Sequence, residues 1–207
     1  MLRVAVFVSG RGSNLRAIFE ALKNGEKKAK VSAVVSNLAT CGAFDIAREF
    51  NVPTYLVSPV QKEGFLSYDE LREVFVTLGI ELIVLAGFLK KIPDSFVEFF
   101  SYKIINIHPA LLPSFGGKGM YGINVHQAVF KSSAKVSGAT VHFVNNVYDE
   151  GAIIDQRCVS ISECTSPEEI AKKVLEVEHI LLPSVVMKFA ENKVKVINNR
   201  VILEENK

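Results

Sequence analysis

Asn106 and His108 are the residues whose types and spacing best suit proton-transfer chemistry in this sequence. They stand one residue apart in an apolar run, so an extended strand places both on one face and the isoleucines on the other. Histidine transfers protons near neutral pH, and an asparagine amide can donate to a developing oxyanion. The alternative is a hydrogen-bonded core histidine beside a strand-end asparagine, and these residues alone leave it open.

Asp149 is the carboxylate that could complete such a group. It opens the turn Asp149-Glu150-Gly151, which follows the strand expected to carry His142. An aspartate near a histidine can orient the imidazole and stabilise its charged form. Turns also favour aspartate and glycine for local reasons, so this motif alone is a weak signal. His142 is a candidate for a supporting role.

The segment Ser9 to Asn14 is typical of an anion-binding turn. Its glycines permit a sharp turn after an apolar run, and the helix that follows presents free N–H groups and a positive dipole end. It is not the dinucleotide fingerprint, because Leu15 stands where a glycine is required, and it lacks the lysine of a P-loop. An ordinary strand-to-helix turn, capped by Ser13 or Asn14, is the alternative.

The elements that must position these residues alternate between the periods of strands and helices. Apolar runs followed by amphipathic segments indicate βαβ units and a mostly parallel twisted sheet with helices on both faces, a three-layer α/β fold of the Rossmann type. We expect one domain over residues 1–207. The expected strands are Arg3 to Ser9, Val31 to Asn37, Pro53 to Val57, Glu81 to Ala86 and Lys103 to Ile107; the expected helices are Asn14 to Lys23, Cys41 to Phe50 and Ser67 to Leu78.

The second half of the chain has a looser pattern. A glycine-rich loop over Pro113 to Gly122 precedes a short helix, and a strong helix start at Ser166-Pro167 predicts a long helix to about Ala190. Alternation around Asn198-Asn199 predicts a terminal hairpin. The remaining expected elements are the helix Val125 to Lys131 and the strands Gly138 to Asn145 and Ala152 to Ile161.

Composition narrows the classes of partner. The formal charge is only +2, from 24 basic and 22 acidic residues, without the clustered basic stripe of a nucleic-acid binder. The three cysteines have no metal-ligand spacing, so we expect reduced thiols, no metal and a cytoplasmic protein. The N-terminal apolar run is too short for a signal peptide. We expect small-molecule substrates, neither nucleic acid nor a membrane as partner, and a monomer or homodimer.

Taken together, these segments resemble the glycinamide ribonucleotide formyltransferase family of the formyltransferase superfamily. The resemblance covers residues 4 to about 183, and its motifs are highly specific in combination. The stretches that carry it are VAVFVSGRGSNL, VVSN, IVLAGFLKKIP, IINIHPALLPSF, GATVHFVNNVYDEGAIIDQ and EVEHILLP.

The resemblance implies a role for each matching position. The catalytic trio is Asn106, His108 and Asp149; Gly12, Ser13 and Asn14 hold the substrate's phosphate, and Glu178 holds its ribose; the folate pocket is lined by Leu85, Phe88, Leu89, Lys90 and Val144. The expected reaction transfers a formyl group from 10-formyltetrahydrofolate, the co-substrate, to the amine of glycinamide ribonucleotide in purine biosynthesis. The resemblance also predicts a cis Leu112–Pro113 peptide.

Two positions depart from the family pattern. Lys90 stands where relatives often carry arginine, so contacts with folate there would lose the forked geometry. The loop Gly116 to Asn124 is longer than in the shortest relatives.

Three other functions are weighed against the transferase. A formyltetrahydrofolate deformylase uses the same trio to admit water but normally carries an extra N-terminal domain. A methionyl-tRNA formyltransferase carries a further C-terminal domain. A non-catalytic nucleotide-binding module would explain the turn and the sheet, but not three polar groups that converge at the sheet edge.

Overall fold

A mostly parallel sheet with helices forms the framework of the protein, as the alternating periods predict. The computed structural model describes residues 1–23 and 28–204, and the seven strands follow the order β3-β2-β1-β4-β5-β6-β7. By their internal contacts the residues form two compact units, Met1–Ile105 and Asn106–Lys207. The boundary falls within β5 (Ile104–His108), so this strand begins in the first unit and ends in the second.

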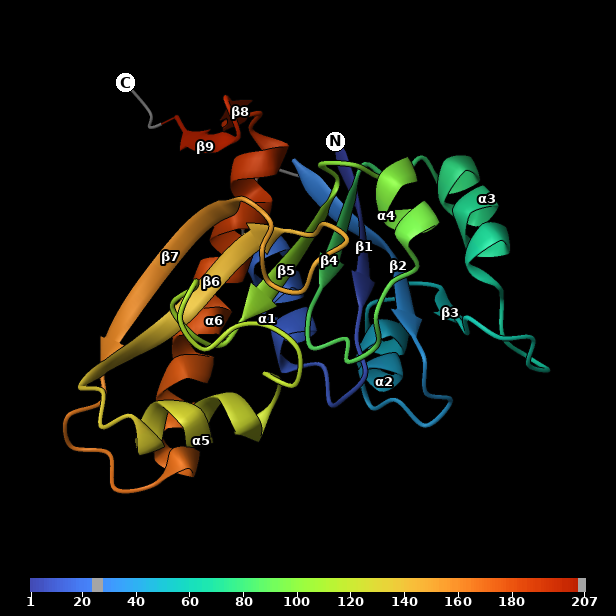
Figure 1. Cartoon of the computed structure of the whole chain (residues 1–207). Coiled ribbons are helices and arrows are strands. Elements are labelled where there is room, and N and C mark those ends of the chain that lie inside the picture. Colours follow the sequence, from blue (N-terminus) through green and yellow to red (C-terminus); the bar gives the residue numbers. More distant parts are fainter. Residues whose placement is uncertain (24–27, 205–207) are drawn as a thin grey trace. The chain divides into compact units, whose positions relative to one another are not determined.

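The first unit contains the parallel part of the sheet (Figure 1). β1 pairs in parallel with β2 and with β4, and β2 pairs in parallel with β3. Its elements are β1 (Leu2–Phe7), α1 (Ser13–Lys23), β2 (Ala29–Ser36), α2 (Ala43–Glu49), β3 (Thr54–Leu56), α3 (Tyr68–Leu78), β4 (Leu82–Leu85) and α4 (Asp94–Phe99). Each expected element of this half is present, and α4 is an additional short helix that the sequence pattern did not predict.

Aromatic packing fills one part of the first unit's core. The ring of Phe7, fully buried on β1, meets Phe75 edge to face at 5.9 Å and Phe88 at 5.2 Å between centroids. Such pairs add to the free energy of burial. Phe88 belongs to the segment expected to line a folate pocket, and here its side chain is part of the core.

The second unit begins at Asn106, within β5, and includes the antiparallel part of the sheet. β6 pairs antiparallel with β7, and α6 begins at Pro167 behind Ser166, whose hydroxyl accepts from the backbone N–H of Glu169. This is the predicted helix start. The elements are α5 (Ile123–Lys131), β6 (Val136–Phe143), β7 (Ile153–Ser160), α6 (Pro167–Ala190), β8 (Val194–Ile197) and β9 (Arg200–Leu203).

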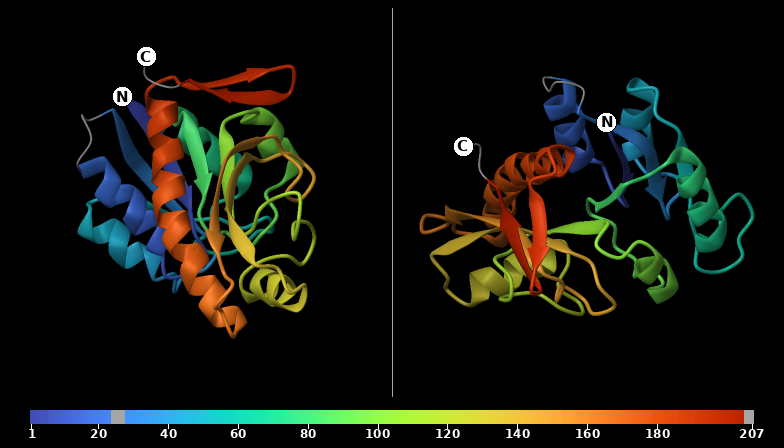
Figure 2. Two further views of the ribbon diagram at one scale, coloured as in Figure 1. Left: turned by 90° about the vertical axis from the view of Figure 1, so that its left-hand side faces the viewer. Right: turned by 90° about the horizontal axis from the view of Figure 1, so that it is seen from above.

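The long helix α6 leads into the predicted terminal hairpin (Figure 2). β8 and β9 pair antiparallel, and Asn198 and Asn199 between them both adopt positive φ, as a tight hairpin turn requires. α6 packs against β6, β7 and α5. Within the described part of the chain, the helices lack the combination of length and apolar character needed to cross a bilayer.

The chain between β5 and α5 takes a tight path. The Leu112–Pro113 peptide is cis, as the resemblance predicts, and Phe115 has a positive φ of 57°. Thr140 on β6 donates to the carbonyl oxygen of Ala110 (2.6 Å) and accepts from the backbone N–H of Leu112 (3.0 Å). This hydroxyl therefore ties the turn that follows His108 to β6.

Candidate active site

His108 lies at the end of β5 with both ring nitrogens in defined surroundings. Its Nε2 is 2.9 Å from the carbonyl oxygen of Phe115, which can only accept, so Nε2 carries the hydrogen. Its Nδ1 faces Oδ2 of Asp149 at 3.6 Å. This distance is longer than a hydrogen bond, and a small shift of either side chain would bring the two atoms to hydrogen-bond length. The carboxylate thus lies beside the imidazole, as predicted. In the neutral ring, Nδ1 holds the free lone pair.

Asn106 is oriented by a second histidine. Its amide nitrogen is 3.1 Å from Nε2 of His142, and Nδ1 of His142 is 2.8 Å from the carbonyl oxygen of Phe143. Since that carbonyl can only accept, Nδ1 of His142 is the donor, and Nε2 is left to accept an amide hydrogen from Asn106. The other hydrogen of this amide remains for a further acceptor. His142 thereby has the supporting contact for which the sequence made it a candidate.

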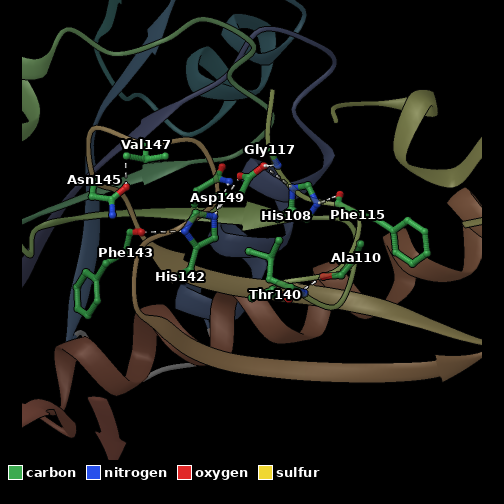
Figure 3. A network of polar contacts seen from close by, with 12 residues as sticks. His108, Ala110, Phe115, Gly117, Thr140, His142, Phe143, Asn145, Val147 and Asp149 are labelled. Carbon is green, nitrogen blue, oxygen red and sulfur yellow. Dashed lines mark hydrogen bonds and ion pairs between the residues drawn. The ribbon is translucent and has the colours of Figure 1, made fainter. Parts of the chain in front are cut away.

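Asp149 connects the two histidines (Figure 3). Its Oδ1 is 3.6 Å from Nε2 of His142, and its Oδ2 accepts from the backbone N–H of Gly117 at 2.9 Å. Burial acts to raise the pKa of Asp149, but the contacts with His142, His108 and Gly117 together hold that pKa below its usual value. Near neutral pH the group is a carboxylate.

The charge of His108 is decided by burial rather than by its carboxylate neighbour. Burial lowers the pKa of His108, while Asp149 and the Phe115 carbonyl raise it, and the net shift is downward. The sequence suggested that Asp149 stabilises the charged form. It does act in that direction, but the loss of hydration on burial is larger. His108 is therefore neutral at pH 7 in the free protein.

Two features of the backbone shape this site. Asp149 itself has a positive φ of 58°, a left-handed conformation that is uncommon for residues other than glycine but that aspartate tolerates better than most. The β6–β7 register shifts between Val141 and His142, and such bulges re-aim side chains. Gly151 has to be glycine, because a Cβ there would lie 1.7 Å from the carbonyl oxygen of Phe143.

Thr140 and Gln156 are supporting residues that the sequence did not identify. The amide nitrogen of Gln156 donates to the carbonyl oxygen of Leu112 and to the hydroxyl of Thr140, both at 2.9 Å. With the bonds of Thr140 described above, these contacts hold the turn between His108 and Phe115. The sequence pointed to these two residues only because both lie in a stretch that resembles the formyltransferase family.

The predicted anion turn lies in the first unit, at the start of α1. The backbone N–H of Arg16 donates to the carbonyl oxygen of Gly12, so the helix begins there and the preceding N–H groups of its first turn point to its N-terminal end. A pocket of about 160 Å³ is lined by residues 10–14 together with Val8, Ala86 and Gly87. This arrangement can accept an anion.

The other expected ligand-binding residues differ in exposure. Leu85 and Phe88 are buried in the core of the first unit, whereas Leu89 and Lys90 are exposed. In the second unit, Glu178 is buried on α6 and Val144 is half-buried after β6. Within the 85–90 segment, the side chains that a ligand can reach are therefore those of Leu89 and Lys90.

Known proteins are similar to this chain over most of its length. The family model described as formyl transferase matches residues 2–186. A phosphoribosylglycinamide formyltransferase of Arabidopsis thaliana, named as chloroplastic, is 44% identical over 207 residues, which are 99% of this chain and 71% of the relative. One from Haemophilus influenzae is 33% identical, across 99% of this chain and 94% of the relative. The crystal structure of phosphoribosylglycinamide formyltransferase from Anaplasma phagocytophilum has a TM-score of 0.89 and 34% identity, covering 100% of this chain and 95% of that one.

Gly12 offers a test of the anion turn's backbone. Its φ is +82°, and an added Cβ would lie 2.7 Å from the Cβ of Ala43, so Gly12→Ala combines strain with a clash. We expect the free energy of unfolding to fall by roughly 1–3 kcal/mol. Gly10→Ala is the matched control, since nothing lies within 4 Å of its added Cβ. Urea denaturation measures both variants, and equal stability of the two would contradict this account.

His126 on α5 makes stability depend on pH. Burial lowers the pKa of His126 to about 4, with a smaller contribution from His108, and its Nδ1 has no hydrogen-bond partner among the described residues. The unfolded chain therefore binds a proton that the folded protein excludes. This contribution to stability is complete above about pH 6.5, the ordinary value, and is lost as the pH falls towards about 4.

We expect His126 to account for about 2 kcal/mol of the loss in unfolding free energy between pH 7 and pH 5. His126→Gln removes the ionisable group and should flatten this dependence. His179→Gln serves as the control, because His179 is less buried, although burial also lowers its pKa. Urea denaturation at the two pH values decides the matter; an unchanged pH dependence in His126→Gln would count against it.

Proposed function

Because the chain belongs to the formyl transferase family, we propose that it transfers a formyl group from 10-formyltetrahydrofolate to the amine of glycinamide ribonucleotide, a step of purine biosynthesis. The folate is the co-substrate, and the catalytic residues are Asn106, His108 and Asp149. The observation that carries the proposal is the arrangement of His108. Its Nε2 donates to the Phe115 carbonyl, which leaves Nδ1 as a lone-pair base 3.6 Å from a carboxylate oxygen.

The first step is attack by the amine. The neutral amine of the ribonucleotide forms a bond to the formyl carbon, and the carbonyl electron pair moves to the oxygen. The amide hydrogen of Asn106 that His142 does not use donates to this oxyanion. Because His142 fixes the amide, the donor is already oriented before charge develops.

The second step moves a proton from one nitrogen to another. Nδ1 of His108 accepts the proton that the attacking amine loses, and Asp149 stabilises the imidazolium that forms. The imidazolium then protonates the folate nitrogen as its bond to the formyl carbon breaks, and the oxyanion returns to a carbonyl. A lowered pKa of His108 suits this role, since the free protein presents the neutral base.

The same proposal assigns the binding residues. Gly12, Ser13 and Asn14 hold the phosphate through backbone N–H groups at the start of α1, and Glu178 accepts from the ribose hydroxyls. The folate contacts the segment that ends in Leu89 and Lys90, and Val144. A cytoplasmic location is kept as the expectation from the sequence, and the names of plant relatives place those proteins in the chloroplast.

Transfer and hydrolysis can be told apart with the wild-type protein. Folate absorbance is followed with the formyl donor alone and with the donor plus the amine. A transferase consumes the donor only when the amine is present, and the formylated amine accumulates in equal amount. Release of formate from the donor alone would identify a deformylase instead.

The trio should behave as one catalytic unit. Asp149→Asn keeps the shape of the side chain but removes the charge that stabilises imidazolium, so turnover should fall by roughly 10²–10⁴. His108→Ala should be similarly damaging. The double variant should be little worse than either, because groups that act in one step are not additive. Steady-state kinetics measures all three.

Asp155→Asn is the matched control for the change at Asp149. Asp155 lies on β7, and its carboxylate pairs with Lys188 at 2.9 Å, outside the trio. This variant should lose some stability and retain turnover. Losses at His108 and Asp149 that simply multiply would indicate independent roles, and a nearly active Asp149→Asn would exclude the assignment.

Ser13 tests the phosphate site. A carboxylate in the first turn of α1 repels a phosphate there, so Ser13→Asp should weaken binding of the phosphorylated amine roughly 3- to 30-fold. Affinity for folate should be nearly unchanged. Ser13→Asn, of similar size without charge, is the control, and titration calorimetry gives each affinity. An equal loss of both affinities, or a loss of neither, would refute this site.

A further inference from the structure

Ser9 stands where the backbone ladders of three parallel strands end. The register of β1 with β2 and with β4 stops at Phe7, opposite Val35 and Leu85. Further backbone bonds follow on each side. Towards β2, the N–H of Val8 donates to the carbonyl oxygen of Val35 (2.9 Å); towards β4, the N–H of Ala86 donates to that of Phe7 (2.9 Å) and the N–H of Ser9 to that of Gly87 (3.0 Å).

The hydroxyl of Ser9 makes the next contact on both sides. It donates to Oδ1 of Asn37, which follows β2, at 2.6 Å. It accepts from the backbone N–H of Leu89, which follows β4, at 3.0 Å. A hydroxyl has one hydrogen to donate and lone pairs to accept, so the two bonds are compatible. One side chain therefore joins the segments that leave β1, β2 and β4.

Two of those segments, after β1 and after β4, are the ones that bind the two substrates in the proposed function. Ser9 is followed by the anion turn at residues 10–14, and Leu89 is followed by Lys90. Ala86 and Gly87 line the same pocket as the anion turn. β1 lies between β2 and β4, and the loops of such a strand border the crevice where open α/β sheets bind ligands.

We propose that Ser9 is a positioning residue that couples the phosphate turn to the folate segment, so that binding of the phosphorylated amine and of the folate favour each other. This inference rests on the proposed function for the identity of the two ligands. Ser9 acts through Leu89 and Asn37. Ordering one segment orders the other through the shared hydroxyl, which makes the coupling reciprocal.

The test compares Ser9→Ala with two control variants. They distinguish the loss of the Ser9 hydroxyl from a general loss of stability. Ser9→Thr keeps the hydroxyl. Ser67→Ala makes the same chemical change at the start of α3, where the hydroxyl of Ser67 accepts from the backbone N–H of Glu70, and it serves as the matched control. The affinity for tetrahydrofolate is measured by calorimetry with and without glycinamide ribonucleotide, together with kcat and KM.

We expect the amine to tighten tetrahydrofolate binding in the wild-type protein, and Ser9→Ala to abolish most of this enhancement. The KM for the folate donor should rise roughly 5- to 30-fold, because the variant removes two hydrogen bonds that position the folate segment, with kcat within about threefold. Ser9→Thr and Ser67→Ala should keep the wild-type KM. Asn37→Ala should have a weaker effect, and the double variant with Ser9→Ala should match Ser9→Ala alone.

Three results would overturn the role of Ser9: an unchanged donor KM and enhancement in Ser9→Ala, equal damage in Ser67→Ala, or losses at Ser9 and Asn37 that multiply. Failure of the proposed function gives a different result, since the wild-type protein would then not formylate the amine at all. A wild-type protein that formylates normally, beside an unaffected Ser9→Ala, rejects only the coupling.

Discussion

Asp149 keeps a negative charge in a partly buried position because the backbone N–H of Gly117 donates to it and the rings of His108 and His142 lie beside it. A carboxylate without such partners would take up a proton on burial. Each of these partners then acquires a defined orientation from the carboxylate. The loop that follows the cis proline, the strand that bears Asn106 and the strand that bears His142 meet at this one group.

Two backbone carbonyl groups near the carboxylate orient the hydrogen bonds of the two histidines. Carbonyl oxygens of Phe115 and Phe143 can accept but not donate, so they fix which nitrogen of each histidine carries the hydrogen. The result is a free lone pair at Nδ1 of His108 and a donor amide at Asn106. Backbone carbonyl groups therefore determine which nitrogen of each histidine carries the hydrogen, and a search for sequence motifs does not detect such groups.

Burial disfavours both charged forms at this site, but only at His108 does the net pKa shift follow burial. Burial lowers the pKa of His108 despite the adjacent Asp149, yet the pKa of Asp149 falls despite its own burial. The difference arises because Gly117 and the two neighbouring imidazoles together outweigh the burial of the carboxylate, whereas Asp149 and the Phe115 carbonyl do not outweigh the burial of the imidazolium. A neutral base beside an ionised carboxylate is the combination that can accept a proton and then stabilise it.

The sequence by itself determined the alternating α/β class, the start of α6 at Ser166-Pro167, the hairpin at Asn198-Asn199, and the types of residue that could do the chemistry. These are local properties, carried by period and turn chemistry over a few residues. It did not predict the short α4, whose six residues offer little periodicity. Only the tertiary structure decided that Asp149 reaches two imidazoles, that Thr140 and Gln156 hold the turn after His108, and that burial outweighs Asp149 in setting the charge of His108. Contacts between residues far apart in sequence, and the hydration that each group loses, depend on how all the elements pack, and no local pattern records that sum.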